Sequence, residues 1–419
     1  MPEESTNRSV GAIFYDQTLF LGRHTEIQSV KEVLALMVGQ GQGSHILMFR
    51  GSRGLGKTWF SLHLQRIVIP EWKKEQRNDV TNLWIGMDTI PDLAYGEKTS
   101  DPGEYRFFSG SSDHAPEAST HKLLYYIAQQ IDALHSMDAG YIQIQWILDK
   151  LRASDCYLVL VFDSLFELEW KYISELERAV LAPLSELANV LLIITGRGPE
   201  YTWSIARFRA QPAAVLKPFE EEYEPHVEQD YIADQLRTQA FTQHTLSDIR
   251  EQEIIQQIKA QTKGYPLNNL LIAQALITPE QWDLYADELL EPYPKLSDEG
   301  KATIKALATL SPDARFREEE IEELGSYVAK KQLSGTDVRR QLYSSNIIHW
   351  DRGGWVIEEA VADFFRAQLV FDSNIKERFT ALHQRAIAMY DRWQKEEQNP
   401  QAYKQEISYH REQLGKEPS

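Results

Sequence analysis

The sequence predicts an α/β domain with a parallel sheet, followed by a helical domain and a winged-helix domain. In the first half, apolar runs of strand length alternate with helical patterns. Runs that are apolar on both faces and separated by helices indicate a parallel sheet covered on two sides. Past Phe219 the strand signals stop and helical patterns take over, until two short strand signals follow three helical patterns near Trp350.

The expected sheet has four strand signals, at 45–49, 83–88, 157–162 and 190–195. Helical patterns fall at 27–37, 59–67, 122–134 and 142–151. The polar stretch 91–116 has no clear period and predicts an irregular insertion. Ligands of such sheets bind at the carboxyl ends of the strands, where Asp163 and Arg197 would emerge.

A complete phosphate-binding motif, G-x-x-x-x-G-K-T, follows the first strand signal. Its residues are Gly51, Ser52, Arg53, Gly54, Leu55, Gly56, Lys57 and Thr58, with Trp59 next in the helical pattern. The glycines let backbone N–H groups curl around an anion, Lys57 supplies positive charge to the β- and γ-phosphates, and the Thr58 hydroxyl can bind Mg²⁺. Strand, loop and helix in this order predict a nucleotide-binding site in an α/β P-loop NTPase fold.

Asp163 ends a strand of the type that carries the Walker B acid. Its carboxylate is expected to arrive from a neighbouring strand and to hold, directly or through water, the Mg²⁺ shared with Thr58. The alternative is an Asp that caps the following helix. A second acid would orient the attacking water, but that position holds Ser164. Glu167, one turn further, could take over as base, or hydrolysis is slow.

Arg197 follows the fourth strand signal. A guanidinium fork suits phosphate oxygens, so Arg197 can reach a γ-phosphate and report whether it is present. The alternative is a surface arginine after a strand.

The second half reads as helices at 227–236, 246–261, 267–276 and 279–290, a breaker cluster at 291–294, the winged-helix pattern, and a helical segment at 375–412. Gly264 would end one helix and Pro266 would open the next. The expected domains are a tail at 1–18, the P-loop NTPase domain at 19–218, a helical domain at 219–292, a winged-helix domain at 293–370 and a C-terminal helical segment at 371–419.

An ordered set of motifs over 19–370 resembles the STAND class of signalling NTPases, a branch close to the AAA+ ATPases. The set comprises Leu21-Gly22-Arg23, the phosphate loop, the Asp163 strand, Thr195-Gly196-Arg197, Gly264-Tyr265-Pro266 and the winged helix. The resemblance implies that Gly22 and Arg23 lie near the adenine and that Arg197 senses the γ-phosphate. It also implies that Pro266 packs near the base and ribose, and that the winged helix clamps an ADP-bound state.

Two departures from the family pattern stand out. A histidine often follows the wing and touches the β-phosphate of ADP, whereas this position holds Glu358. A carboxylate would repel phosphate, so the clamp is expected to be weaker or built differently. Family members also carry an effector domain before the NTPase and sensor repeats after it, and neither is found here, so effector and sensor are expected to be separate proteins.

Composition and net charge restrict the class of protein and its expected partners. Hydrophobic residues make up 42% and charged residues 25%, as in folded soluble proteins. The net charge of −18 argues against extensive nucleic-acid contact and leaves room only for a small basic patch. The apolar runs are too short to span a membrane, and the acidic start lacks a secretory signal. The sequence therefore predicts a cytoplasmic protein with no membrane partner.

The first hypothesis is a molecular switch that binds ATP/ADP with Mg²⁺, hydrolyses ATP slowly, and self-associates or engages separate effector and sensor proteins. The second is a DNA-binding AAA+-like ATPase that reads DNA through its winged helix, where Arg339 and Arg340 fall on the expected recognition helix. The third is a non-hydrolysing nucleotide-bound scaffold, favoured by Ser164 and Glu358.

Overall fold

The computed structural model describes most of the chain. The described residues are 16–40, 45–76, 79–88, 104–108, 116–132, 143–153, 157–197, 201–219, 230–290, 296–345, 347–351, 353–372, 376–397, 401 and 403–415. They form two compact units. The first, called the sheet unit here, comprises Tyr15–Gly51 and Leu55–Lys217, and the second, called the helical unit, contains Pro218–Ser419 together with the loop residues Ser52–Gly54.

The sheet unit is built on six strands in the order β3-β2-β4-β5-β1-β6, and every neighbouring pair is parallel. The strands are β1 His45–Arg50, β2 Val80–Asp88, β3 Glu104–Phe108, β4 Tyr157–Asp163, β5 Val190–Gly196 and β6 Ala214–Val215. All of β5 and all but the first residue of β4 are buried, as expected of central strands covered on both faces. The α/β fold with a parallel sheet is therefore confirmed.

Three details of the predicted sheet were wrong. The stretch 91–116, interpreted as an irregular insertion, contains strand β3, which pairs with β2. Strand β6 was not expected, and it adds two residues beside β1. Strand β4, which ends in Asp163, is not the immediate neighbour of β1, because β5 lies between them.

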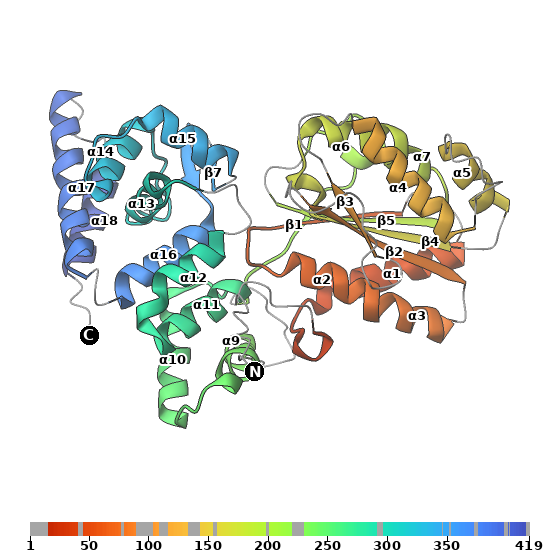
Figure 1. Cartoon of the computed structure of the whole chain (residues 1–419), viewed down its shortest axis with the longest axis horizontal. Coiled ribbons are helices and arrows are strands. Elements are labelled where there is room, and N and C mark those ends of the chain that lie inside the picture. Colours follow the sequence, from red (N-terminus) through yellow and green to blue (C-terminus); the bar gives the residue numbers. More distant parts are fainter. Residues whose placement is uncertain are drawn as a thin grey trace, which may run out of the picture. The chain divides into compact units, whose positions relative to one another are not determined.

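Helices cover both faces of this sheet (Figure 1). One face carries α1 His24–Gln40 and a continuous helical run formed by α2 Lys57–His63, a π-helical turn Leu64–Val68 and α3 Ile69–Gln76. The other face carries α4 Pro116–Gln130, α5 Ile144–Ala153 and the run of α6 Trp170–Leu176, a π-helical turn Glu177–Leu181 and α7 Ala182–Leu184. Short helices at Gln17–Leu19, Leu165–Glu167 and Ala206–Arg209 complete the unit.

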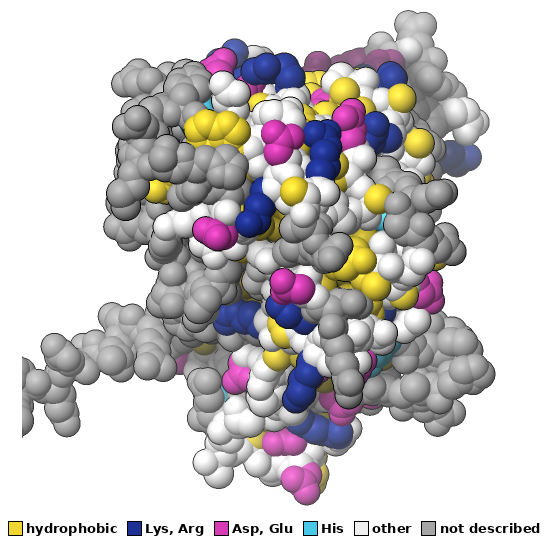
Figure 2. Space-filling view, turned by 90° about the vertical axis from the view of Figure 1, so that its right-hand side faces the viewer, with side chains coloured by type: hydrophobic (Ala, Val, Ile, Leu, Met, Phe, Trp, Pro, Cys, Tyr) yellow, Lys and Arg dark blue, Asp and Glu magenta, His cyan; other side chains and the backbone are white. Residues whose placement is uncertain are grey.

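Charges of both signs are interspersed over the face drawn in Figure 2. Lys and Arg side chains there lie close to Asp and Glu, and hydrophobic side chains occur singly or in small groups between them. Among the described residues of the chain, no helix combines the length and the apolar composition that a membrane span requires.

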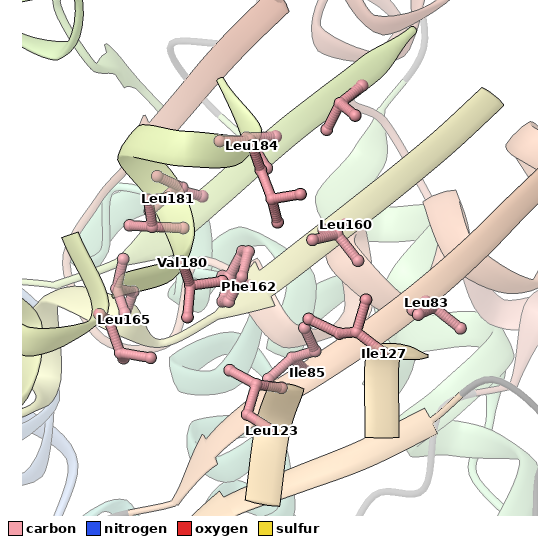
Figure 3. Close-up of a cluster of buried hydrophobic side chains, with 14 of the residues drawn as sticks. Leu83, Ile85, Leu123, Ile127, Leu160, Phe162, Leu165, Val180, Leu181 and Leu184 are labelled. Carbon is pink, nitrogen blue, oxygen red and sulfur yellow. The ribbon is translucent and has the colours of Figure 1, made fainter. Parts of the chain in front are cut away.

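A large hydrophobic core cluster of the sheet unit lies between the sheet and the α4 layer (Figure 3). Ile85 of β2 lies next to Leu123 and Ile127 of α4, and Phe162 of β4 lies beside Val180; all are fully buried. Burying one such side chain contributes about 1.5–3 kcal/mol. The rigid ends of these central strands therefore provide a fixed support for the polar residues that follow them.

The helical unit contains ten described α-helices and one hairpin. They are α9 Tyr231–Gln235, α10 Asp248–Gln261, α11 Pro266–Ile277, α12 Trp282–Leu290, α13 Asp298–Leu307, α14 Glu318–Ala329, α15 Gly335–Ser344, β7 Ile348–Asp351, β8 Gly354–Ile357, α16 Glu359–Phe371, α17 Lys376–Glu396 and α18 Lys404–Gly415. Side-chain oxygens of Ser247, Ser297 and Ser334 accept N-cap hydrogen bonds at α10, α13 and α15.

Helices α13, α14 and α15 followed by the antiparallel β7–β8 hairpin form the predicted winged helix. The wing is extended by a bridge between Phe316 and Trp355. The first residues of the pattern predicted at 227–236, and the breaker cluster at 291–294, lie outside the described residues. The domain limits at 292 and 370 stay predictions.

Candidate functional site

The phosphate-binding motif forms a loop between β1 and α2. Gly54 and Gly56 adopt positive φ angles of 79° and 77°, a backbone region that L side chains rarely enter, so the motif needs glycine at both positions. The buried Lys57 ammonium donates to the carbonyl oxygen of Gly51 at 2.9 Å, across the loop from its own backbone. The ammonium is therefore held at the loop that the sequence predicts to bind phosphate.

Asp163 lies at the end of β4 beside the first turn of α2. Its carboxylate accepts hydrogen bonds from the hydroxyls of Thr58 at 2.8 Å and Thr195 at 2.7 Å, and Ser61 Oγ lies 3.0 Å away. The side chain is buried, and burial raises the pKa of this carboxyl, with hydrogen bonds from Thr195 and Thr58 opposing the rise. The structure thus brings together Thr58 and Asp163, the two residues predicted to share a metal.

The oxygen atoms of this pair suit a magnesium ion. Mg²⁺ prefers hard oxygen ligands and is usually held by one or two protein groups together with phosphates and water. Thr58 Oγ1 and Asp163 Oδ2 are such a pair, and Thr58 is exposed. Within the described residues no group of three or more His, Cys, Asp or Glu side chains is arranged to hold a metal by itself. The pair therefore fits an ion that arrives with a nucleotide.

Ser61, Thr195 and Trp84 belong to this arrangement and were missed as site residues. The Asp163 carboxylate is contacted from α2, by Thr58 and Ser61, and from β5, by Thr195. The indole N–H of Trp84 on β2 donates to Ser61 Oγ at 2.9 Å and so supports Ser61 from a third element. Ser61 comes one helical turn after Thr58, a spacing that places both hydroxyls on one face of α2. That spacing is the signal that could have identified Ser61.

Glu167 and Arg197, predicted as base and γ-phosphate sensor, contact each other. Arg197 Nη2 lies 2.7 Å from Glu167 Oε2, and both side chains are largely buried. Gly196 makes this approach possible, because a Cβ there would lie 2.7 Å from the backbone nitrogen of Phe166. Ser164, at the position where a second acid was sought, has a positive φ of 63° and begins the short turn that carries Glu167.

Gly22 and Arg23 lie just before α1 with φ angles of 72° and 66°. The Arg23 guanidinium is buried and donates to the carbonyl oxygens of Leu55 and Lys217, both at 2.8 Å. Arg23 therefore supports the backbone of the phosphate loop. Its predicted place near the adenine stays a prediction, as does that of the half-buried Trp59 on α2.

In the helical unit, Pro266 opens α11 as predicted. The next residue, Leu267, donates its backbone N–H to the carbonyl oxygen of Gly54 at 3.1 Å. The buried Tyr265 hydroxyl donates to Glu359 Oε2 at 2.6 Å, and Lys263 pairs with the same carboxylate. Within this unit, the Gly264–Leu267 turn thus contacts the part of the loop formed by Ser52–Gly54.

Glu358, at the position where the resemblance implies a histidine, contacts the same loop segment. The backbone N–H of Arg53 donates to Glu358 Oε1 at 2.5 Å. The Glu358 side chain is 8% exposed, and its backbone N–H donates to Ile347 O at 2.7 Å. A carboxylate of this unit therefore occupies one amide of the phosphate loop.

No protein-family model matches the chain, and no curated protein matches it. Among solved structures, the Aeropyrum pernix ORC2 protein in complexes with ADPNP and ADP is similar, with 12% identity, a TM-score of 0.40, and coverage of 87% of this chain and 99% of that one. The Walker-type ATPase PABY2304 of Pyrococcus abyssi has 11% identity and a TM-score of 0.41, covering 84% and 97%. The Aeropyrum pernix ORC1 protein in complex with DNA has 13% identity and a TM-score of 0.35, covering 86% and 94%.

The strand order, the loop and the acid that faces it define the class of the fold. The chain has an α/β P-loop NTPase fold with a parallel sheet, followed by a helical region that contains the winged helix. The identities and TM-scores of the similar structures are too low to transfer a function from any of them to this chain.

Proposed function

We propose that this protein binds ATP and ADP at the phosphate loop together with Mg²⁺, and that it hydrolyses ATP slowly as a molecular switch. The observation that carries the proposal is the hydrogen bond between Thr58 and Asp163, 2.8 Å long, at the end of a complete phosphate-binding motif. A hydroxyl and a buried carboxylate from two separate elements meet where the motif would place the metal of a nucleotide.

Each residue of the site has a part in this proposal. The loop amides would bind phosphate oxygens, and Lys57 would turn from Gly51 O toward the β- and γ-phosphates. Thr58 and Asp163 would hold the Mg²⁺, which supplies charge neutralisation between the phosphates. Arg197 would leave Glu167 to reach the γ-phosphate, and Glu167, released from the pair, could then accept a proton from water.

The wider role is proposed on the resemblance to STAND proteins. A change of the bound nucleotide would alter the packing of the helical unit and favour self-association or binding to separate effector and sensor proteins. This role places the protein in the cytoplasm. A non-hydrolysing scaffold is the alternative that a phosphate-release assay would identify.

DNA binding through the winged helix is the second candidate, and α15 is the element that would read the groove. Arg339 on this helix lies 2.6 Å from Glu318, and Arg340 lies 3.5 Å from Asp337. Both arginines predicted for DNA contact therefore have an acid beside them. A gel shift at low ionic strength tests this candidate, and a salt-dependent shift at micromolar protein would favour it over a purely nucleotide-driven switch.

The test of nucleotide binding is the affinity of Lys57→Ala for ADP and ATP, measured by calorimetry with Mg²⁺. Loss of the ammonium should weaken binding by about tenfold or more, since hydrogen bonds to charged groups contribute about 1.5–3 kcal/mol. Lys74→Ala, an exposed lysine on α3, is the control and should bind like the parent. Equal affinity of the parent and Lys57→Ala would contradict the proposal.

A further inference from the structure

The backbone N–H of Arg53 already has an anionic partner in this structure. Arg53 is the third residue of the phosphate loop, and its N–H donates to the carboxylate of Glu358 at 2.5 Å. A carboxylate oxygen and a phosphate oxygen are alike in this respect, because both are anionic acceptors of backbone N–H groups. Glu358 thus makes the type of contact that a nucleotide phosphate would make with the loop.

The position of this carboxylate is fixed from several directions. Glu358 follows directly after β8, and its own N–H donates to Ile347 O, so the wing of the winged helix sets its backbone. Glu359, the first residue of α16, is bound by Tyr265 and Lys263. Glu358 is the one residue between β8 and α16, so its backbone position is fixed on both sides. This restricts the conformations of its side chain, which is almost fully buried.

The loop segment is held from a second side within the same unit. Leu267 N donates to Gly54 O at 3.1 Å, and a Cβ added at Gly54 would lie 3.2 Å from the Leu267 side chain. Glu358 therefore binds the N–H of Arg53, while the start of α11 contacts the next residue, Gly54. The contact between Arg53 and Glu358 is part of a packed arrangement of backbone groups.

We propose that Glu358 is an internal phosphate surrogate that competes with the nucleotide for the phosphate loop. This inference rests on the proposed nucleotide binding. A carboxylate and a phosphate oxygen that shared this one N–H would lie close together, and two negative charges at close range repel each other. A nucleotide phosphate that takes the Arg53 amide must therefore displace Glu358, and the cost of displacement lowers the apparent affinity.

Removal of the surrogate should consequently strengthen the binding of phosphate-bearing ligands. Glu358→Ala removes both the acceptor and the charge, and we expect about tenfold to a hundredfold lower Kd for ADP and ATP than in the parent. Glu358→Gln keeps a neutral acceptor of the same shape, so its affinity should fall between the two. Adenosine, which carries no phosphate, should bind the parent and both variants alike.

The experiment measures Kd for ADP, ATP and adenosine by calorimetry on the full chain, with thermal unfolding as the check of folding. Glu319→Gln, an exposed acid on α14, is the charge-matched control and should leave every Kd unchanged. If Glu358→Ala does not fold, the isosteric Glu358→Gln carries the test alone, and tighter ADP binding by it supports the inference.

Two outcomes separate this inference from the function on which it rests. If Lys57→Ala weakens ADP binding while both Glu358 variants bind ADP like the parent or more weakly, the surrogate is overturned and nucleotide binding stands. If Lys57→Ala and the Glu358 variants all leave ADP binding unchanged, nucleotide binding at this loop is overturned, and the surrogate with it.

Discussion

Arg197 and Glu167 form an ion pair with a nitrogen-to-oxygen distance of 2.7 Å, at the carboxyl ends of β5 and β4. The side chains are 13% and 15% exposed, so water screens their attraction less than at an open surface. The two residues that we propose as γ-phosphate sensor and base thus restrain each other. The pair offers a measurable coupling between two proposed functional residues.

We predict that this coupling shows in a double-mutant cycle. Arg197→Ala, Glu167→Ala and the double variant should give an interaction free energy of about 1 kcal/mol or more, above the median for exposed pairs. Urea unfolding followed by circular dichroism measures it. Additive effects of the two substitutions would mean that the pair contributes nothing to stability.

Substitution of Asp163 is expected to raise the stability of the protein and to lower its ATPase activity. Burial raises the pKa of its carboxyl above the unfolded value, so at neutral pH the ionised form costs native stability. Asp163→Asn removes the charge and should raise the melting temperature at pH 8. Phosphate release from ATP should fall roughly 100-fold, since the proposed ligand of Mg²⁺ is lost. Hydrolysis at the parental rate would refute the assignment of Asp163.

Ser61→Ala is the control that separates the loss of the Asp163 charge from the loss of a hydrogen bond around this carboxylate. Ser61→Ala removes one of the polar contacts of the carboxylate and leaves the charge in place. We expect it to keep measurable hydrolysis and not to gain stability. A melting temperature of Asp163→Asn below that of the parent would contradict the electrostatic explanation.

The buried carboxyl of Asp363 should make the free energy of unfolding depend on pH. The pKa of its carboxyl is raised to about 7, chiefly by burial and to a lesser degree by Glu359, while Arg366 and the backbone N–H of Lys263 oppose the rise. The unfolded carboxyl titrates near 3.8, so the stability that the protonated form contributes is full below that pH and is lost as pH rises through about 7. Lowering the pH from 8 to 6 should therefore stabilise the parent, relative to Asp363→Asn, by about 1 kcal/mol.

The measurement is the urea midpoint and slope of both proteins at pH 8, 7 and 6. Other raised carboxyls, such as Glu320 with its pKa near 7, titrate in both proteins and cancel in the difference. A difference that does not change with pH would show that the Asp363 carboxyl titrates outside this window.

The central strands were predictable because their neighbours bury them on both faces. The runs that became β4 and β5 are apolar almost throughout, and no other local structure explains such runs between helices. Strand β3, Glu104–Phe108, pairs with β2 alone at the edge of the sheet, and its short sequence mixes charged and aromatic residues. Nothing local marks it as a strand, since its pairing depends on the position of β2.

Part of the candidate site could likewise be predicted from the sequence, and part depends on the fold. The phosphate loop is contiguous, so its glycines, Lys57 and Thr58 could be identified from spacing. The contacts of Ser61 and Thr195 with Asp163, and of Trp84 with Ser61, follow from the strand order, which places β4 between β2 and β5. The contact between Arg53 and Glu358 joins residues 305 positions apart, and the resemblance indicated only that Glu358 takes the position of a histidine that touches the β-phosphate of ADP.

The hydrogen bond from the Trp84 indole to Ser61 Oγ makes Trp84 an intrinsic fluorescence probe of the Asp163 site. Indole emission responds to charge and polarity around the ring, and here the ring is separated from the Asp163 carboxylate by one hydroxyl. Loading of the site with a cation, or neutralisation of that acid, should shift the fluorescence spectrum without any attached dye. Occupancy could thus be followed in real time in the unlabelled protein, with Trp84→Phe giving the background emission of the other nine tryptophans.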